Sequence, residues 1–276
     1  MSLTKPRLTA LFAALALLAI AAFAAGCGSS DDSTTGGGDT SGGGGETLTV
    51  GSDIPYPPFE QGKPPYEGFD VELMNAVAAN IGRTAEFQDT SFDTIFVDLG
   101  QHKFEAVASA ATITDEREKT VDFSNPYYLA EQAILVEKGG AIDSVEKLKG
   151  ATVGAQKGTT GAEFVDETAE AGELRVFPQG PDAINALKAG TVEAVVMDIP
   201  VAENAAEANS AIEVSAAIPT EEEYGFAVAQ GDTELLDELN EGLAEAIDDG
   251  TYAKIYEKWF KHAPPESIET ATHEAT

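Results

Sequence analysis

Residues 108–118 read ASAATITDERE, where small and hydroxyl side chains are followed by acids and one arginine. One interpretation is purely local, with Thr114 capping a helix whose first turn holds Asp115 and Glu116. Capping does not account for Arg117, because the positive end of a helix dipole disfavours a cation in the first turn. A guanidinium beside small residues suits contact with an anionic group that approaches the main chain closely.

Other polar or aromatic residues stand where predicted strands end. Each has an ordinary alternative, such as a helix N-cap at Thr160 or a turn residue at Asp198. Tyr56 and Phe92 are equally consistent with core aromatics. Because several such residues stand at the ends of different predicted strands, we expect them to form one common site. The strand-end residues with a polar group are Asp53, Tyr56, Ser109, Thr112, Arg117, Thr160 and Asp198.

A free α-amino acid is a ligand that would use these groups together. Binding it desolvates a carboxylate and an ammonium, which is costly unless both are paired. Arg117 offers a fork for the carboxylate, and N–H groups at a helix start near Thr160 offer a second anion contact. Asp198, the Thr112 hydroxyl and the Ala110 carbonyl would accept from the ammonium.

The segments that carry these residues alternate between strand and helix from Thr47 onward, which predicts parallel α/β sheets. Two such blocks, with connections near residues 130 and 222, predict two lobes with a ligand cleft between them. The predicted strands are 48–53, 85–89, 104–109, 133–138, 151–156, 174–179, 192–198 and 224–230. The predicted helices are 73–81, 94–99, 144–150, 158–167, 181–190, 233–248 and 252–260.

The predicted domain organisation follows from this alternation. The first lobe is formed by residues 47–132 and 223–263, and the second lobe by residues 133–222. Residues 264–276 are rich in Pro, Thr and Glu and are predicted to be a flexible tail.

The N-terminal region is typical of an exported protein. Residues 1–26 combine two basic residues with an apolar stretch, which predicts a signal peptide, although a retained membrane anchor is the alternative. Cys27, the single cysteine, directly follows this stretch and is predicted to be lipidated. It begins a segment, 27–46, whose Gly, Ser and Thr content predicts a flexible tether with a reach of roughly 25 Å.

Charge and composition exclude several functions. The formal net charge is −32, and it becomes −34 without residues 1–26, so clustered basic residues for nucleic acid are lacking. The three histidines form no sequence cluster, and no acid–base pair stands apart from the predicted amino-acid site. We therefore expect a binding protein without catalytic residues, cofactor or metal. The histidines are His102, His262 and His273.

From about Leu48 to Phe260 the chain resembles the amino-acid-binding receptors of polar amino-acid ABC importers, family 3 of the extracellular solute-binding proteins. Several motifs in register carry the resemblance: YPPFE, GFDVELMNAVA, FEAVASAATITDERE, VDFSNPYY, LKGATVGAQKGTTG, ALKAGTVEAVVMD and GTYAKIYEKWF. It implies a two-lobed type II periplasmic-binding-protein fold with the ligand in the interlobe cleft. The end of the signal segment likewise resembles a bacterial lipobox.

The resemblance also implies roles for individual residues. Arg117 and the main chain at Thr160 would hold the ligand carboxylate, and Asp198 with Thr112 would hold the ammonium. The remaining implied site residues are the aromatic pair Tyr56 and Phe92, the acid Asp53 at the polar tip of the ligand, the small residues Ser109 and Ala110, and Gln156, where some glutamine receptors carry a lysine.

Together these observations predict a lipid-anchored monomer on the extracytoplasmic face of the cell membrane, which delivers an amino acid to an ABC permease. Asp53 near two aromatic rings favours a basic amino acid, with cation–π contacts contributing about 1 to 2 kcal/mol. Glutamine or another polar amino acid is the alternative ligand. A dehydratase-like enzyme and a sensor domain are alternative functions on the same fold.

Overall fold

The computed structural model describes residues 45–268. The predicted signal peptide, Cys27, nearly all of the predicted tether and residues 269–276 lie outside the described residues. The chain divides into two units, and every described residue belongs to the second, Gly42–Thr276.

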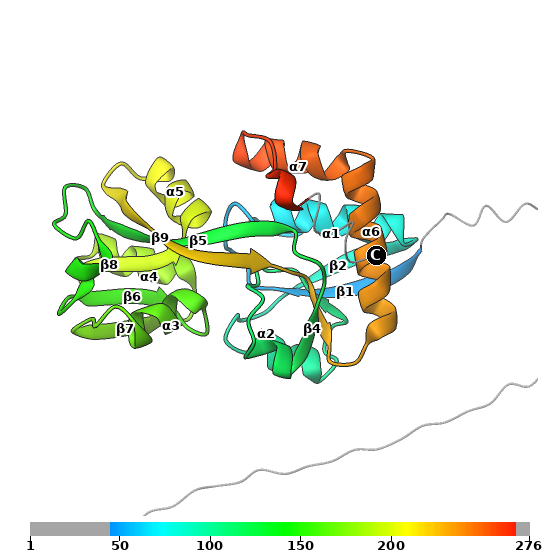
Figure 1. The fold of residues 1–276 in the computed structure, drawn as a ribbon, viewed down its shortest axis with the longest axis horizontal. Coiled ribbons are helices and arrows are strands. Elements are labelled where there is room, and N and C mark those ends of the chain that lie inside the picture. Colours follow the sequence, from blue (N-terminus) through cyan, green and yellow to red (C-terminus); the bar gives the residue numbers. More distant parts are fainter. Residues whose placement is uncertain (1–44, 269–276) are drawn as a thin grey trace, which may run out of the picture. The chain divides into compact units, whose positions relative to one another are not determined.

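Two five-stranded sheets form the two lobes (Figure 1). The strand order of the first sheet is β2-β1-β3-β10-β4. Its strands are β1 (Glu46–Ser52), β2 (Arg83–Asp89), β3 (Ala106–Val107), β4 (Val121–Phe123) and β10 (Ala227–Ala229). The strand order of the second sheet is β7-β6-β8-β5-β9. Its strands are β5 (Tyr128–Glu137), β6 (Thr152–Gln156), β7 (Glu173–Phe177), β8 (Ala194–Asp198) and β9 (Ile212–Tyr224).

The helices follow the strands, as the sequence alternation predicts. In the first lobe they are α1 (Phe69–Asn80), α2 (Ile95–Gly100), α6 (Thr233–Asp248) and α7 (Thr251–Phe260). In the second lobe they are α3 (Thr160–Glu167), α4 (Gly180–Lys188) and α5 (Ile199–Ala208). Two short 3-10 helices, η1 (Arg117–Lys119) and η2 (Val145–Leu148), complete the elements. None of the described helices is long and apolar enough to cross a membrane.

Both sheets are mixed rather than purely parallel. β1 pairs in parallel with β2 and β3, and β6 pairs in parallel with β7 and β8, because helices connect these strands. β10 is antiparallel to β3 and β4, and β5 is antiparallel to β8 and β9. The prediction of parallel sheets was therefore correct only for the βα units.

β5 and β9 connect the two lobes. They pair along nearly their whole lengths, with register shifts near Gln132 and Leu135, and Figure 1 shows them side by side between the two groups of elements. The predicted lobe boundaries at residues 132 and 222 fall inside these strands. No element was predicted for residues 199–223, where α5 and β9 lie, because the Glu-rich end of β9 lacks the apolar character of a buried strand.

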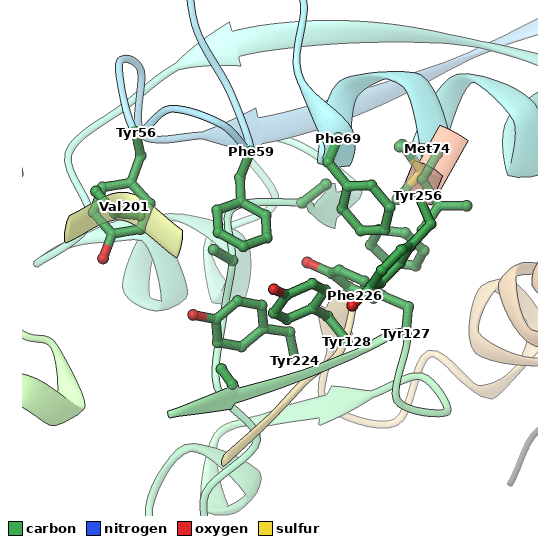
Figure 2. Close-up of a cluster of buried hydrophobic side chains, with 14 of the residues drawn as sticks. Tyr56, Phe59, Phe69, Met74, Tyr127, Tyr128, Val201, Tyr224, Phe226 and Tyr256 are labelled. Carbon is green, nitrogen blue, oxygen red and sulfur yellow. The ribbon is translucent and has the colours of Figure 1, made fainter. Parts of the chain in front are cut away.

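The first lobe contains a dense aromatic cluster beside the crossing strands (Figure 2). Phe59 contacts Tyr128 and Tyr224 edge-on, with ring centroids 5.2 and 5.4 Å apart. Tyr127 stacks on Phe226 with centroids 4.4 Å apart. These side chains are almost fully buried, so the start of β5 and the end of β9 are fixed to the first lobe.

Residues 114–120 correct one local prediction. Thr114 does cap the turn, since its hydroxyl oxygen accepts from the Arg117 N–H at 3.2 Å. The turn that follows is the three-residue 3-10 helix η1 and not an α-helix. The predicted helix at 144–150 is likewise only η2. A run this short carries too few aligned peptide groups for a sizeable dipole, so the expected penalty on Arg117 does not apply.

Candidate functional site

All ten predicted binding residues line one cavity, whose empty space amounts to about 300 Å³ when the open solvent at its mouth is included. The ten residues are Asp53, Tyr56, Phe92, Ser109, Ala110, Thr112, Arg117, Gln156, Thr160 and Asp198. Glu60 and Thr159, which were not predicted as ligand-binding residues, line the same cavity.

The strand ends explain why residues so far apart in the sequence meet. Asp53 directly follows β1, Ser109 follows β3 closely, and Asp198 is the last residue of β8. Gln156 ends β6, and the loop after it leads to the N-terminus of α3 at Thr160. Because β1 and β3 are parallel, as are β6 and β8, the carboxyl ends of each pair open on the same edge of their sheet.

Arg117 is a buried cation without an acidic partner in the described part of the chain. Its side chain is in none of the ion pairs there, and the residue is only 9% exposed. Nη1 donates to the Thr112 carbonyl at 2.6 Å, and Nη2 donates to the Gly158 carbonyl at 3.0 Å. The guanidinium lies 5.3 Å from the Phe92 ring centroid. Burial lowers the pKa of Arg117, and the negative charges of Glu163, Glu222 and Asp198 oppose that shift.

A second group of polar side chains surrounds the carboxylate of Asp198. The Tyr56 hydroxyl and Gln132 Nε2 each donate to it at 2.5 Å. Glu222, on β9, accepts from the hydroxyls of Thr112 and Thr160 at 2.7 and 2.8 Å. Burial, followed by the charge of Glu222, raises the pKa of Asp198 to about 6. The site therefore holds two carboxyl groups close to one another on different strands.

A third group consists of Asp53 and Glu60, whose carboxyl groups each keep one oxygen without a partner. Asp53 Oδ2 accepts from Gln156 Nε2, whereas its Oδ1 is buried and unpaired. Glu60 Oε1 accepts from the Ser109 hydroxyl at 2.9 Å, whereas its Oε2 is buried and unpaired. Burial raises the pKa of Asp53 to about 6 and that of Glu60 well above its usual range. A buried acceptor without a donor is costly, so a ligand donor would stabilise it.

Several contacts connect the two lobes directly across the cavity. Tyr56 reaches Asp198, Asp53 reaches Gln156, and Arg117 reaches the Gly158 carbonyl. At the rim, the Lys157 ammonium pairs with Asp93 at 2.8 Å. This last pair is more than half exposed on the lysine side and contributes at most about 1 kcal/mol.

The N-cap of α3 is Thr159 and not Thr160. The Thr159 hydroxyl oxygen accepts from the Ala162 N–H at 3.2 Å, whereas the Thr160 hydroxyl donates to Glu222. The local alternative considered for Thr160 is therefore wrong. The first N–H groups of α3, at Thr160 and Gly161, have no intrahelical acceptor and lie beside the cavity that Thr160 lines.

Three residues of this network were missed by the sequence analysis. Glu60 lies in the quoted motif YPPFE, but nothing in the motif distinguishes a buried acid from a surface acid. Gln132 lies on β5, and Glu222 lies on β9. For Glu222 a signal exists, because in a strand the middle acid of the run 221–223 points to the opposite face from its neighbours. The described residues contain no group of His, Cys, Asp and Glu arranged to hold a metal ion.

Comparison with known proteins places this geometry in a family. The family model of the bacterial extracellular solute-binding proteins, family 3, matches residues 48–262. The ABC transporter glutamine-binding protein GlnH of Bacillus subtilis is 36% identical over 204 residues, which cover 72% of this chain and 75% of that protein. The arginine-binding extracellular protein ArtP of the same species is 34% identical over 219 residues, which cover 77% of this chain and 86% of that protein.

A solved structure agrees with the observed fold. The arginine-, lysine-, histidine-binding protein ArtJ from Geobacillus stearothermophilus superimposes with a TM-score of 0.77 at 33% identity. The match covers 81% of this chain and all of that chain. The two-lobed α/β architecture expected from the sequence is therefore confirmed.

Proposed function

The chain belongs to the bacterial extracellular solute-binding proteins of family 3, and from this premise we propose that it captures a free L-amino acid with a basic side chain. The observation that carries the proposal is the charge of the cavity. One cation, Arg117, lines it together with three carboxyl groups, those of Asp53, Glu60 and Asp198. An α-amino acid with a basic side chain offers one anionic group for Arg117 and two cationic groups for the carboxyl groups.

The α-carboxylate of the ligand would bind Arg117. This guanidinium has no acidic partner among the described residues, so it is poised for an external anion. The N–H groups at the start of α3, near Thr160, would add a second contact, because the positive end of the helix dipole favours an anion.

The α-ammonium would bind on the opposite side of the cavity. Asp198 carries a negative charge there. Glu222, which accepts from the hydroxyls of Thr112 and Thr160, adds a second negative charge. The hydroxyl of Thr112 and the carbonyl of Ala110 would complete the acceptors that three N–H bonds require.

The cationic tip of the side chain would bind between Asp53 and Glu60. Their unpaired oxygens, Oδ1 and Oε2, are buried acceptors that a guanidinium or ammonium can satisfy. The rings of Tyr56 and Phe92 line the same cavity and supply flat apolar surface for the aliphatic part of the ligand. Gln156 and Ser109 would hold the two carboxyl groups in place through their existing hydrogen bonds.

Glutamine is the alternative ligand. Its amide would donate to one of the two unpaired oxygens, but it would leave the charge of Asp53 uncompensated. The relatives include proteins named for each ligand, because GlnH of Bacillus subtilis is a glutamine-binding protein and ArtP of the same species is an arginine-binding protein. The excess of acids in the cavity is the observation that favours the basic ligand here.

Ligand capture would favour the arrangement in which the lobes contact one another. Arg117 and Thr112 come from the first lobe, formed by residues 47–132 and 223–263, and Thr160 and Asp198 come from the second lobe, residues 133–222. Only their approach lets one ligand pair both of its charges. The crossing strands β5 and β9 are the segments about which such a movement would turn.

The place of this protein in transport follows from the same premise. It would present the amino acid to the transmembrane subunits of an ABC importer, as a monomer and without enzymatic activity. Lipidation of Cys27, after removal of residues 1–26, would hold it at the extracytoplasmic face of the membrane, with 27–46 as the tether. We expect Cys27→Ser to release the protein from the membrane fraction, and a variant that stays attached would favour a retained apolar anchor.

Calorimetric titration of the purified protein tests the proposed ligand class. L-Arginine, L-lysine and L-histidine are titrated in parallel with L-glutamine at pH 7.5. We expect at least one basic amino acid to bind more tightly than L-glutamine. The absence of binding for every basic amino acid would refute the proposal, and tighter binding of L-glutamine would select the alternative ligand.

A further inference from the structure

Ala110 lines the cavity in a backbone conformation that alanine rarely adopts. Its φ is 45°, in the left-handed region, and it is 5% exposed. For a residue with a Cβ this region costs a factor of about 5 to 30 in an equilibrium constant. Four other described residues that are not glycine have positive φ, and none of them lines this cavity. Something in the surrounding structure must therefore hold Ala110 in place.

The contact that holds it comes from Asp70, in the first turn of α1. Asp70 Oδ2 accepts from the Ala110 N–H at 2.7 Å, and the same oxygen accepts from the Tyr127 hydroxyl at 2.7 Å. Asp70 is fully buried and is absent from the cavity lining. Its carboxyl group is thus directed to a backbone N–H of the binding loop and to the residue that precedes β5.

The chemistry of this carboxyl group is unusual for a residue that only begins a helix. An acid in the first turn of a helix is favourable at the surface, where its charge stays hydrated. Here burial raises the pKa of Asp70 to about 7, and its second oxygen, Oδ1, is buried without a partner. Such a placement is costly, and the dipole of α1 alone does not compensate for it. The bond to Ala110 gives the position a purpose.

We propose that Asp70 is a positioning residue, which binds no ligand itself but fixes Ala110 in the left-handed conformation that the amino-acid site requires. The proposal rests on the proposed function, because φ and ψ of Ala110 set the direction of the carbonyl that accepts from the ligand ammonium. Without the bond from its N–H, Ala110 relaxes toward negative φ. Binding must then restore the strained conformation, and affinity falls by the corresponding factor.

Glycine at position 110 separates this role from a general effect on stability. Glycine adopts positive φ about as readily as negative φ, so a chain with Ala110→Gly needs no anchor to reach the binding conformation. We expect Asp70→Ala to weaken binding of L-arginine by about 5- to 30-fold in the chain that keeps Ala110. In the chain that also carries Ala110→Gly, the same substitution should weaken it by less than about threefold. A merely structural loss would be equal in both chains.

Two variants provide the controls. Asp70→Asn keeps an oxygen that can accept from the Ala110 N–H, so it should retain affinity within about threefold of the wild type. Tyr127→Phe removes the other bond to Oδ2 without changing the contact to Ala110, and it should leave the conformation of Ala110 unchanged. If Asp70→Ala does not fold, Asp70→Val fills the buried space with apolar atoms while still removing the acceptor.

A crystal structure of the unliganded Asp70→Ala variant, or of Asp70→Val in its place, decides the proposal without any ligand. We expect Ala110 to leave the left-handed region, and a φ that stays near 45° would overturn the proposal. Equal losses of L-arginine affinity with and without the Ala110→Gly substitution would overturn it as well. Failure of the wild type to bind any basic amino acid would refute the proposed function alone, because the crystallographic comparison still tests the anchor.

Discussion

Replacing Arg117 with methionine should nearly abolish binding of L-arginine while changing the stability of the unliganded protein little. Arg117 is 9% exposed and donates to two backbone carbonyls, those of Thr112 and Gly158. Methionine keeps much of the apolar contact with Phe92 and removes the charge. The variant therefore separates the role of the cation in binding from its role in packing.

The size of the effect follows from what the ligand carboxylate would lose. Removing one partner of a buried ion pair leaves an uncompensated charge, which costs about 3 to 5 kcal/mol. At about 1.4 kcal/mol for each factor of ten, affinity should fall by about 10²- to 10⁴-fold. In the unliganded protein two effects on stability nearly cancel. The loss of two hydrogen bonds destabilises the folded state, whereas the removal of a buried cation stabilises it. We expect its free energy of unfolding to change by less than about 2 kcal/mol.

Calorimetry and chemical denaturation measure the two quantities separately. Arg175→Met is the matched control, because Arg175 is an exposed arginine paired with Glu173 on the second lobe. It should leave affinity unchanged. Agmatine, which is arginine without the carboxylate, should bind the wild type weakly and lose less than about tenfold in Arg117→Met. The reasoning is refuted if Arg117→Met binds L-arginine within tenfold of the wild type, or if agmatine loses as much affinity as L-arginine.

Three further predictions concern the carboxyl groups of the cavity. Glu60→Gln should weaken the binding of L-arginine by about 10- to 100-fold, since hydrogen bonds to a charged group are worth about 1.5 to 3 kcal/mol. The affinity for L-glutamine should change by less than about threefold. Parallel titrations of the two ligands check this, and equal losses of affinity would contradict it. The pKa values of about 6 for Asp53 and Asp198 predict that the affinity for L-arginine falls as pH drops from 8 to 5. The expected fall is about tenfold for each carboxyl group that must ionise. An affinity that does not change with pH would contradict the assignment of these two carboxyl groups to the ligand. Because these folded-state pKa values lie above the ordinary 3.8, the folded state binds more protons than the unfolded state at pH values between 3.8 and about 6. The free energy of unfolding without ligand should therefore decrease as pH rises from 4 to 7. Chemical denaturation at several pH values measures this decrease.

The meeting of several candidate residues in one cavity was predictable from the sequence, because they stand at the ends of predicted strands. Asp53 and Asp198 stand at the ends of the segments LTVGSD and VEAVVMD, which are predicted strands, and parallel strands bring such ends together. The residue types led to the prediction of an α-amino acid as the ligand, since a lone arginine among threonines and acids matches few other ligands. The set of ten residues in the cavity also includes Gln156, which only the family resemblance implied.

The parts that were not predictable depend on tertiary structure. Glu222 lies in a Glu-rich strand whose pairing with β5 decides which acid faces inward. Asp70 looks like an ordinary first-turn acid until its contact with Ala110 is visible. The crossing strands β5 and β9 extend past the predicted lobe boundaries, because backbone pairing holds them together where their sequences give no apolar alternation.

The central claim is that the cavity recognises a positive charge at the tip of an amino-acid side chain. L-Citrulline is nearly identical in shape to L-arginine but carries a neutral urea group, so a comparison of the two isolates that charge. Titration of the purified wild type at pH 7.5 should give at least about 100-fold weaker binding for L-citrulline, because the charge of Asp53 would then remain uncompensated. Binding of the two ligands within about threefold of one another would contradict the claim.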